Sequence, residues 1–183
     1  MAASSSSSFT ADLAAAHIGA TYNQYADSAM RRARLRAYLD ARADARTILV
    51  GEAAGYRGAR VSGLPFTSER QLTGRGPAEA SATIVQRVLR ELGIEDDVLL
   101  WNVVPTHPGT PASNRPPTHE EIEAARPFLE ELARGRRVLA VGRLAAAVLG
   151  APYLRHPSHG GASAFAAGVR YHFGPADGCP PFL

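Results

Sequence analysis

Four short apolar runs alternate with segments of helical patterning, and this alternation constrains the fold more than any other feature of the chain. The apolar runs lie within residues 46–55, 96–105, 136–142 and 152–158. The helical segments lie at residues 26–43, 77–93, 118–135 and 143–150. Short apolar runs between helices are typical of buried parallel strands. We therefore predict an α/β fold, a three-layer sandwich around a central, mainly parallel four-stranded sheet.

Local signals mark several helix ends. Residues 77–93 begin with proline and end with glycine, which is the usual asymmetry of helix termini. Thr118 stands three residues before Glu121, and this spacing predicts a capping box at the start of the helix 118–135.

Length and composition indicate one domain with a sizeable core. The chain has 183 residues, of which 45% are hydrophobic, and domains commonly have about 100–200 residues. We expect the serine-rich residues 1–10 to be a disordered tail and residues 11–183 to form a single domain. No apolar run approaches the roughly 20 residues that cross a bilayer, so no membrane partner is expected.

Cysteine and charge narrow the function classes. The single cysteine, Cys179, excludes an intramolecular disulfide and an all-cysteine metal site, and it fits a reducing, cytoplasmic location. The net charge of +3 is compatible with a nucleic-acid partner but does not require one. All 20 basic residues of the Lys+Arg total are arginines, whose guanidinium groups suit phosphate contacts.

Polar residues follow each predicted strand, and in parallel sheets ligands bind beyond the carboxyl ends of the strands. Gly51–Gly55 follow the first strand, and these glycines would let backbone amides approach a ligand ring. Glu52, within this loop, is either a functional carboxylate or an ordinary solvated one. Asn102 lies near the end of the second strand, where its amide either caps a turn or reads a base edge.

Two loops add aromatic and imidazole groups. Phe66 follows Pro65 in a loop, where it is either a core plug or a stacking platform for a planar ring. The segment "RHPSHGG" places His156 and His159 in a tight loop after the fourth strand, which is either a surface turn or part of a site.

Taken in order, the motifs "GEAAG", "GLPF", "WNVVPTHP", "VLAVG" and "RHPS" resemble those of the uracil-DNA glycosylase superfamily. The resemblance runs from about Ile48 to Ser158 and is strongest to the family-4-like branch of iron–sulfur enzymes. The cluster cysteines of that branch fall where this chain has Thr106 and Ala125, and the N-terminal cysteine pair is also missing. Since a four-iron cluster needs about four thiolates, we expect no iron–sulfur cluster and no other cofactor. Packing and the prolines of residues 105–117 would then hold the segment that the cluster normally fixes.

The resemblance implies a role for each site residue. Phe66 would stack on a flipped uracil, Asn102 would bind its N3–H and O4, and His156 would donate to O2 as the uracil anion leaves. The uracil-binding loop would include Gly51 and Ala53. Glu52 would position or activate water, or stabilise the oxocarbenium-like sugar.

The DNA contacts implied by the resemblance come from loops and are less determined. Ser158 would bind a phosphate or instead cap the next helix, and His159 with Gly160 would contact or wedge the DNA. Three arginines are further candidates, although each is also a plausible solvated loop charge: Arg57, Arg60 and Arg75.

Two departures from the family pattern bear on chemistry and specificity. The branch has a water-activating aspartate where this chain has Ala53, which leaves Glu52 as the nearest carboxylate. It has a thymine-excluding tyrosine where this chain has Gly55, so exclusion of thymine is not guaranteed.

The sequence therefore predicts a monomeric, monofunctional uracil-DNA glycosylase of base-excision repair, which binds single- or double-stranded DNA and releases free uracil. The absence of lysine removes the usual amine for Schiff-base lyase chemistry. The alternatives are a same-fold glycosylase that acts on hypoxanthine, xanthine or mismatched thymine, a non-catalytic protein that binds uracil in DNA, and a nucleoside or nucleotide binder.

Overall fold

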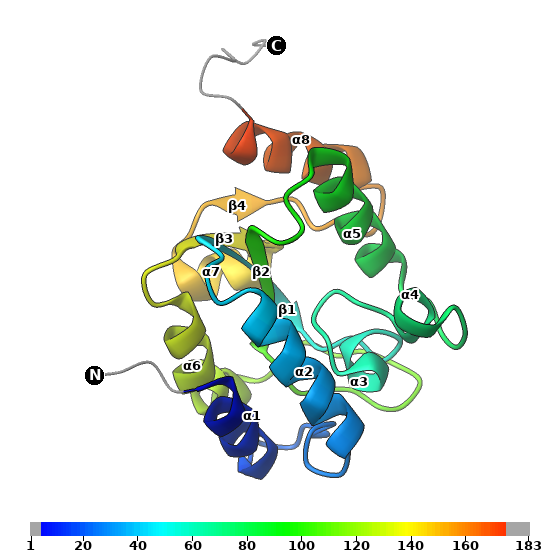
Figure 1. The fold of residues 1–183 in the computed structure, drawn as a ribbon, viewed down its shortest axis with the longest axis vertical. Helices are drawn as coiled ribbons and strands as arrows, with labels where there is room; N and C mark the ends of the chain where they lie inside the picture. Colours follow the sequence, from blue (N-terminus) through cyan, green and yellow to red (C-terminus); the bar gives the residue numbers. More distant parts are fainter. Residues whose placement is uncertain (1–4, 175–183) are drawn as a thin grey trace.

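The sheet at the centre of the molecule has four parallel strands in the order β2-β1-β3-β4 (Figure 1). In this computed structural model, residues 5–174 are described. The strands are β1 (Thr47–Ala53), β2 (Val98–Val104), β3 (Arg137–Val141) and β4 (Tyr153–Leu154). In register, Thr47 stands beside Val98 on one side and Arg137 on the other. The predicted α/β fold around a parallel four-stranded sheet is confirmed.

Eight helices are assigned within residues 5–174, and they flank the sheet (Figure 1). They are α1 (Ser6–Ala15), α2 (Ala29–Ala41), α3 (Ala59–Ser62), α4 (Glu69–Thr73), α5 (Ala80–Leu92), α6 (His119–Ala133), α7 (Arg143–Leu149) and α8 (Ala162–Phe173). Helix α6 packs against β2, α7 against β3 and α8 against β4, while α1 packs on α2. None of these helices has the length and apolar character that crossing a membrane requires.

The core is built on the central strands β1 and β3 and on the edge strand β2. All seven residues of β2 are buried, which explains why its sequence does not alternate between apolar and polar residues. Trp101 of this strand is fully buried, and the ring of Phe9 packs edge-on against it at a centroid distance of 5.7 Å.

The first helix corrects the expected tail over residues 1–10. Helix α1 begins at Ser6, capped by the Ser5 side chain, and Phe9 and Thr10 are buried. Burial of Phe9 and Leu13 on one face of this helix holds the serine-rich segment against the core. Residues 1–4 and Cys179 lie outside the described residues.

The other expected boundaries need smaller changes. The capping box of α6 is confirmed: Glu121 N–H donates to Thr118 Oγ1 at 3.2 Å, and Thr118 N–H donates to Glu121 Oε2 at 2.8 Å. Helix α5 begins at Ala80, three residues later than predicted from Pro77. The expected strand over residues 152–158 is only two residues long, because Pro157 and the turn at residues 157–161 end it.

Candidate active site

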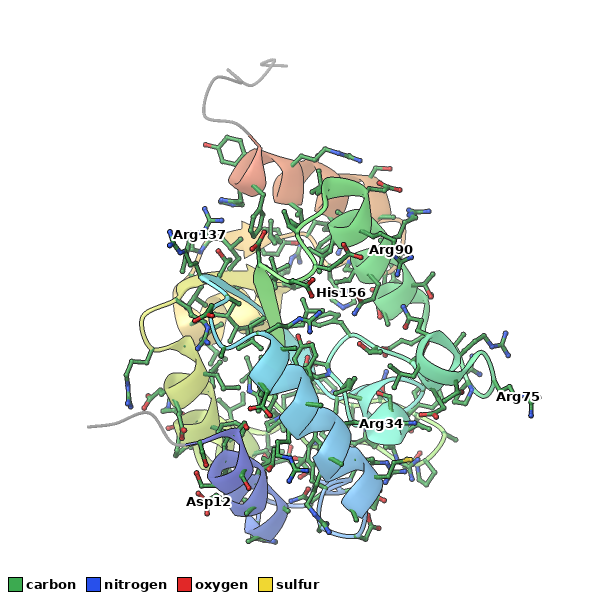
Figure 2. All side chains as sticks on the ribbon, viewed as in Figure 1. Asp12, Arg34, Arg75, Arg90, Arg137 and His156 are labelled. Atoms are coloured by element: carbon green, nitrogen blue, oxygen red, sulfur yellow. The ribbon has the colours of Figure 1, made fainter. Side chains whose placement is uncertain are left out.

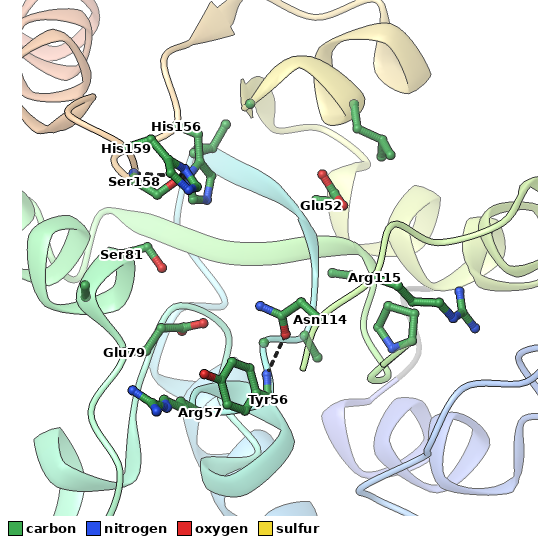
Figure 3. A pocket seen from close by; sticks show the side chains of 18 of the residues that line it. Glu52, Tyr56, Arg57, Glu79, Ser81, Asn114, Arg115, His156, Ser158 and His159 are labelled. Atoms are coloured by element: carbon green, nitrogen blue, oxygen red, sulfur yellow. Dashed lines mark hydrogen bonds between the residues drawn. The ribbon is translucent and has the colours of Figure 1, made fainter. Parts of the chain in front are cut away.

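The carboxyl ends of β1, β3 and β4 open into a cleft of about 720 Å³ (Figure 3). Glu52 comes from β1, Gly142 follows β3 and His156 follows β4. A smaller pocket of about 60 Å³ shares Glu52 and His156 with the cleft and adds Phe66 and Asn102. Four of the residues that the sequence singled out thus line one pocket: Glu52, Phe66, Asn102 and His156.

The Phe66 ring lies directly against the backbone of Gly51. A Cβ on Gly51 would clash with this ring, since it would come within 2.9 Å of its Cε2 atom. Phe66 itself has a φ of 46°, a left-handed conformation that bulky residues rarely adopt. Gln86 holds this backbone in place by donating from Nε2 to the Phe66 carbonyl at 3.1 Å. Phe66 is thus buried, as the core-plug alternative predicts, and it also forms part of the pocket wall.

Asn102 presents its side chain to the same space. Its Oδ1 would stand 2.9 Å from a Cβ on Gly51, which shows that the amide faces the glycine loop. The residue is 5% exposed, and its amide has no hydrogen-bond partner among residues 5–174. The amide borders the pocket, so a ligand there could accept from Nδ2 and donate to Oδ1.

His156 is held in a defined orientation by Ser158. The Ser158 backbone N–H donates to His156 Nδ1 at 3.2 Å, and the Ser158 hydroxyl lies 2.7 Å from the same nitrogen. Because Nδ1 accepts a hydrogen bond, the neutral ring carries its proton on Nε2, which is then free to donate. Burial, and then the nearby charges of Arg155 and His159, lower the pKa of His156 and favour this neutral form.

Ser158 therefore has a role that neither sequence alternative included. Its hydroxyl contacts His156 and also lies 3.0 Å from His159 Nδ1. It does not cap α8, because the N-cap residue of that helix is Gly161. Its side chain orients the imidazole, although Ser158 also lines the cleft.

Glu52 is half-buried and lines both the cleft and the small pocket. Burial raises the pKa of this carboxyl group above its usual 4.5. Ala53 lines both spaces as well, whereas Gly51 acts by making room for Phe66. Glu52 is not the ordinary solvated carboxylate of the alternative interpretation.

The predicted DNA-contacting residues separate into two groups. Arg57 and His159 line the cleft, and His159 has a left-handed φ of 51°. Arg60 lies over the Tyr22 ring, 4.8 Å from its centroid, and is not part of the cleft wall. Gly160 and Arg75 do not line the cleft either; Figure 2 shows Arg75 at the edge of the molecule, away from His156.

Several residues that sequence reasoning missed also line the cleft. Arg143 and Arg155 add positive charge beside β3 and β4, and Asn114 accepts a hydrogen bond from Tyr56 N–H at 2.9 Å (Figure 3). Glu79 lines both the cleft and the small pocket, and burial raises its pKa. The sequence held one signal for Glu79. It stands just before the start of a helix, where a shorter capping residue is usual.

The residues at the cluster positions do not fit an iron–sulfur cluster. Thr106 and Ala125 are fully buried and offer no thiolate, and Thr106 Oγ1 lies 2.6 Å from Thr21 Oγ1. Specific hydrogen bonds hold this segment, in addition to the expected packing and prolines. His107 is fully buried, with Nδ1 2.7 Å from the Ala54 carbonyl and Nε2 2.8 Å from the Thr110 carbonyl.

Comparison with known proteins identifies relatives of this architecture. Residues 39–172 match the family described as the Uracil DNA glycosylase superfamily. Among solved structures, wild-type SMUG2 of Pedobacter heparinus is similar, with a TM-score of 0.68 at 15% sequence identity. The match covers 91% of this chain and 94% of that one, and it shows a shared fold. A comparison with curated proteins finds no match.

Proposed function

This chain belongs to the uracil DNA glycosylase superfamily, and from that membership we propose that it is a monofunctional enzyme that releases uracil from DNA. One observation carries the proposal. The small pocket combines an aromatic ring, a side-chain amide, an imidazole and a half-buried carboxyl group. These groups match the three tasks of holding a base, stabilising its departure and supplying water.

Binding comes first in the proposed mechanism. The nucleotide leaves the base stack, at a cost of a few kcal/mol, and the base enters the pocket against Phe66. The Asn102 amide then offers an acceptor to N3–H and a donor to O4 of uracil. Cytosine presents the opposite order of donor and acceptor at this edge, and a site with such paired hydrogen bonds discriminates by about four to five powers of ten.

His156 acts on the leaving group. As the C1′–N1 bond breaks, its electron pair passes to the uracil ring and negative charge develops on O2. The Nε2–H of neutral His156 donates to that oxygen, since Ser158 occupies Nδ1. Loss of one such donor typically lowers the rate about a hundred- to a thousand-fold.

Glu52 acts on the sugar side. Its ionised carboxylate accepts a proton from water as the water oxygen bonds to C1′, and its charge favours the cationic sugar of the transition state. Glu52 then returns its proton to solvent and the uracil anion takes one up, so the products are free uracil and an abasic site. These steps use only side chains of this chain, so we propose that no metal, cluster or other cofactor takes part.

The substrate is DNA, either single- or double-stranded, held at the rim of the cleft. Arg57, Arg143 and Arg155 line this rim and are suited to phosphate oxygens. A wider base scope, including hypoxanthine, xanthine or mismatched thymine, is a second candidate. The absence of a side chain at Gly55 favours it, except where the Glu79 carboxyl group takes up that space.

The test is the release of free base from single-stranded oligonucleotides that carry uracil, hypoxanthine or thymine at one position. We expect rapid release of uracil, reduced about a hundred-fold or more by His156→Ala and by Asn102→Ala. His119→Ala is a matched control, because His119 is exposed at the start of α6. Tight binding to uracil-containing DNA without free base would contradict the proposal and indicate a binding protein instead.

A further inference from the structure

Glu79 occupies the N-cap position of α5, but its side chain does not cap the helix. N-cap residues usually accept a hydrogen bond from a backbone N–H of the first turn, and Ser, Thr, Asp and Asn do so best. Glu79 provides no such bond, so the helix forgoes this stabilisation. Departures from local rules of this kind are expected at functional positions.

The carboxyl group of Glu79 points instead toward the glycine loop after β1. A Cβ on Gly55 would clash with Glu79 Oε1, and a Cβ on Gly58 would clash with Oε2. The carboxyl group therefore occupies the space that side chains at these two positions would take. Within residues 5–174 it has no hydrogen-bond partner, although it lines the pocket that Phe66 and Asn102 also line.

The proposed mode of binding leaves one edge of the base for this group. His156 comes from the loop after β4 and Glu79 packs on the loop after β1, with Ser81 between them in Figure 3. In the proposed mode of binding, O2 of uracil faces His156 and the N3–O4 edge faces Asn102. The remaining edge, at C5, then faces Gly55 and the Glu79 carboxyl group.

We propose that Glu79 determines base specificity by closing the pocket at C5 of the base, so that uracil fits and the 5-methyl group of thymine is excluded. This inference rests on the proposed function. A methyl group at C5 would meet the carboxyl oxygens directly and would cover polar atoms that have no other partner than water. One misplaced methyl group changes selectivity in a pocket by about 10- to 200-fold.

The experiment compares single-turnover release of uracil and thymine from otherwise identical single-stranded oligonucleotides by three variants. Glu79→Asp withdraws the carboxyl group by one methylene and supplies a better N-cap residue. We expect this variant to melt at the same or a higher temperature, to release uracil, and to raise the thymine-to-uracil ratio by about tenfold or more. Glu79→Ala should raise the ratio further, whereas Glu79→Gln preserves size and polarity and should keep the low ratio of the original chain.

The control is Glu95→Ala, which removes a half-buried carboxylate that pairs with Arg90 at 3.4 Å and lies outside the pocket. It should leave the ratio unchanged. An unchanged ratio in folded Glu79→Asp and Glu79→Ala that still release uracil would overturn this inference alone. Failure of the unaltered chain to release any uracil would overturn the proposed function, so the two failures are distinguishable.

Discussion

His156 and Glu52 line the same pocket, but the proposed reaction needs each in a different protonation state. The imidazole must be neutral with its proton on Nε2, and the carboxyl group must be ionised. The surroundings lower the pKa of His156 and raise that of Glu52, mainly through burial in both cases. Burial disfavours the charged form of each group. It therefore favours the neutral imidazole that the reaction needs, but it reduces the fraction of ionised carboxylate.

The pH dependence of uracil release follows from these two shifts. Glu52 loses its ability to accept a proton as the pH falls through its raised pKa, which lies above the usual 4.5. His156 stays neutral below the usual imidazole value of 6.5 because its pKa is lowered. We therefore expect single-turnover rates that change little near pH 6.5 and fall at more acidic pH.

Glu52→Gln tests this assignment, because glutamine cannot ionise. We expect the rate of this variant to be reduced about a hundred-fold or more. It should also lack the fall at acidic pH that the unaltered chain shows. If the rate of Glu52→Gln fell over the same pH range and by the same factor, the titration would belong to another group. Glu130→Gln, which changes a carboxyl group on α6 outside the cleft, should keep the original profile.

At the scale of elements, α6 is anchored through its capping residue Glu121. This carboxylate is buried and accepts hydrogen bonds from Arg115 and from Thr118 N–H. The bonds to Arg115 are the main cause of the lowered pKa of Glu121. A lowered pKa stabilises the fold above the ordinary carboxyl value of 4.5, and this stability is lost as the pH falls through the lowered value.

We expect Glu121→Ala to reduce the free energy of unfolding by about 2–4 kcal/mol at neutral pH, since it breaks the capping box and leaves Arg115 without its partner. The loss should shrink in strongly acidic solution, where the original carboxyl group is protonated. Urea unfolding at both pH values measures it, with Glu123→Ala as a control because Glu123 is exposed on the same helix. An equal loss at both pH values would show that charge has no part in it.

The loop after β2 contains the buried His107. Both of its ring nitrogens lie within hydrogen-bond distance of carbonyl oxygens, of Ala54 and Thr110. His107→Leu keeps an apolar group of similar size but leaves both carbonyls without this partner. We expect a loss of about 2–4 kcal/mol in unfolding free energy. We also expect slower uracil release, because Ala54 directly follows β1, the strand that carries Glu52. Thermal unfolding that is unchanged in this variant would show that the loop is held without the imidazole.

The elements that could be predicted from the sequence are those that a local pattern of apolar and capping residues specifies. The strand around Ile48 and the capping box of Thr118 are both as expected, because local chemistry alone specifies them. Helix α1 was missed because its serines resemble a tail, while its packing depends on Phe9 meeting Trp101 about 90 residues away in the chain. Helix α8 was missed because its alanines and glycine give a weak pattern.

The candidate site shows the same limit. Asn102 and His156 could be predicted because each lies within two residues of a strand end, and parallel strands end at one edge of a sheet. Glu79 could not, because it reaches the pocket from the loop before α5 through contacts with Gly55 and Gly58. The role of Ser158 depends on the turn of its own loop, which spacing alone does not determine.

At the scale of the whole molecule, the arrangement of charge matters more than the net charge of +3. Many arginines are paired with acids, as Arg34 is with Glu69 at 2.8 Å and Arg87 with Glu91 at 3.7 Å. Of the four arginines that line the cleft, Arg115 pairs with Glu121, whereas three have no acidic partner among residues 5–174: Arg57, Arg143 and Arg155. A positive rim around an active site attracts DNA and positions its phosphates without reading sequence.

This arrangement predicts the salt dependence of DNA binding. Each contact between an arginine and a phosphate of single-stranded DNA contributes about −0.7 to the slope of the logarithm of the binding constant against the logarithm of salt concentration. Replacement of any one of the three rim arginines by alanine should therefore weaken binding and reduce the slope by about 0.7. Fluorescence anisotropy with an oligonucleotide that lacks uracil measures this, since no turnover interferes.

Arg90→Ala removes an exposed arginine of α5 outside the cleft and should leave the slope unchanged. If Arg90→Ala lowered the slope while the rim variants did not, the DNA path would run over α5 and away from the cleft.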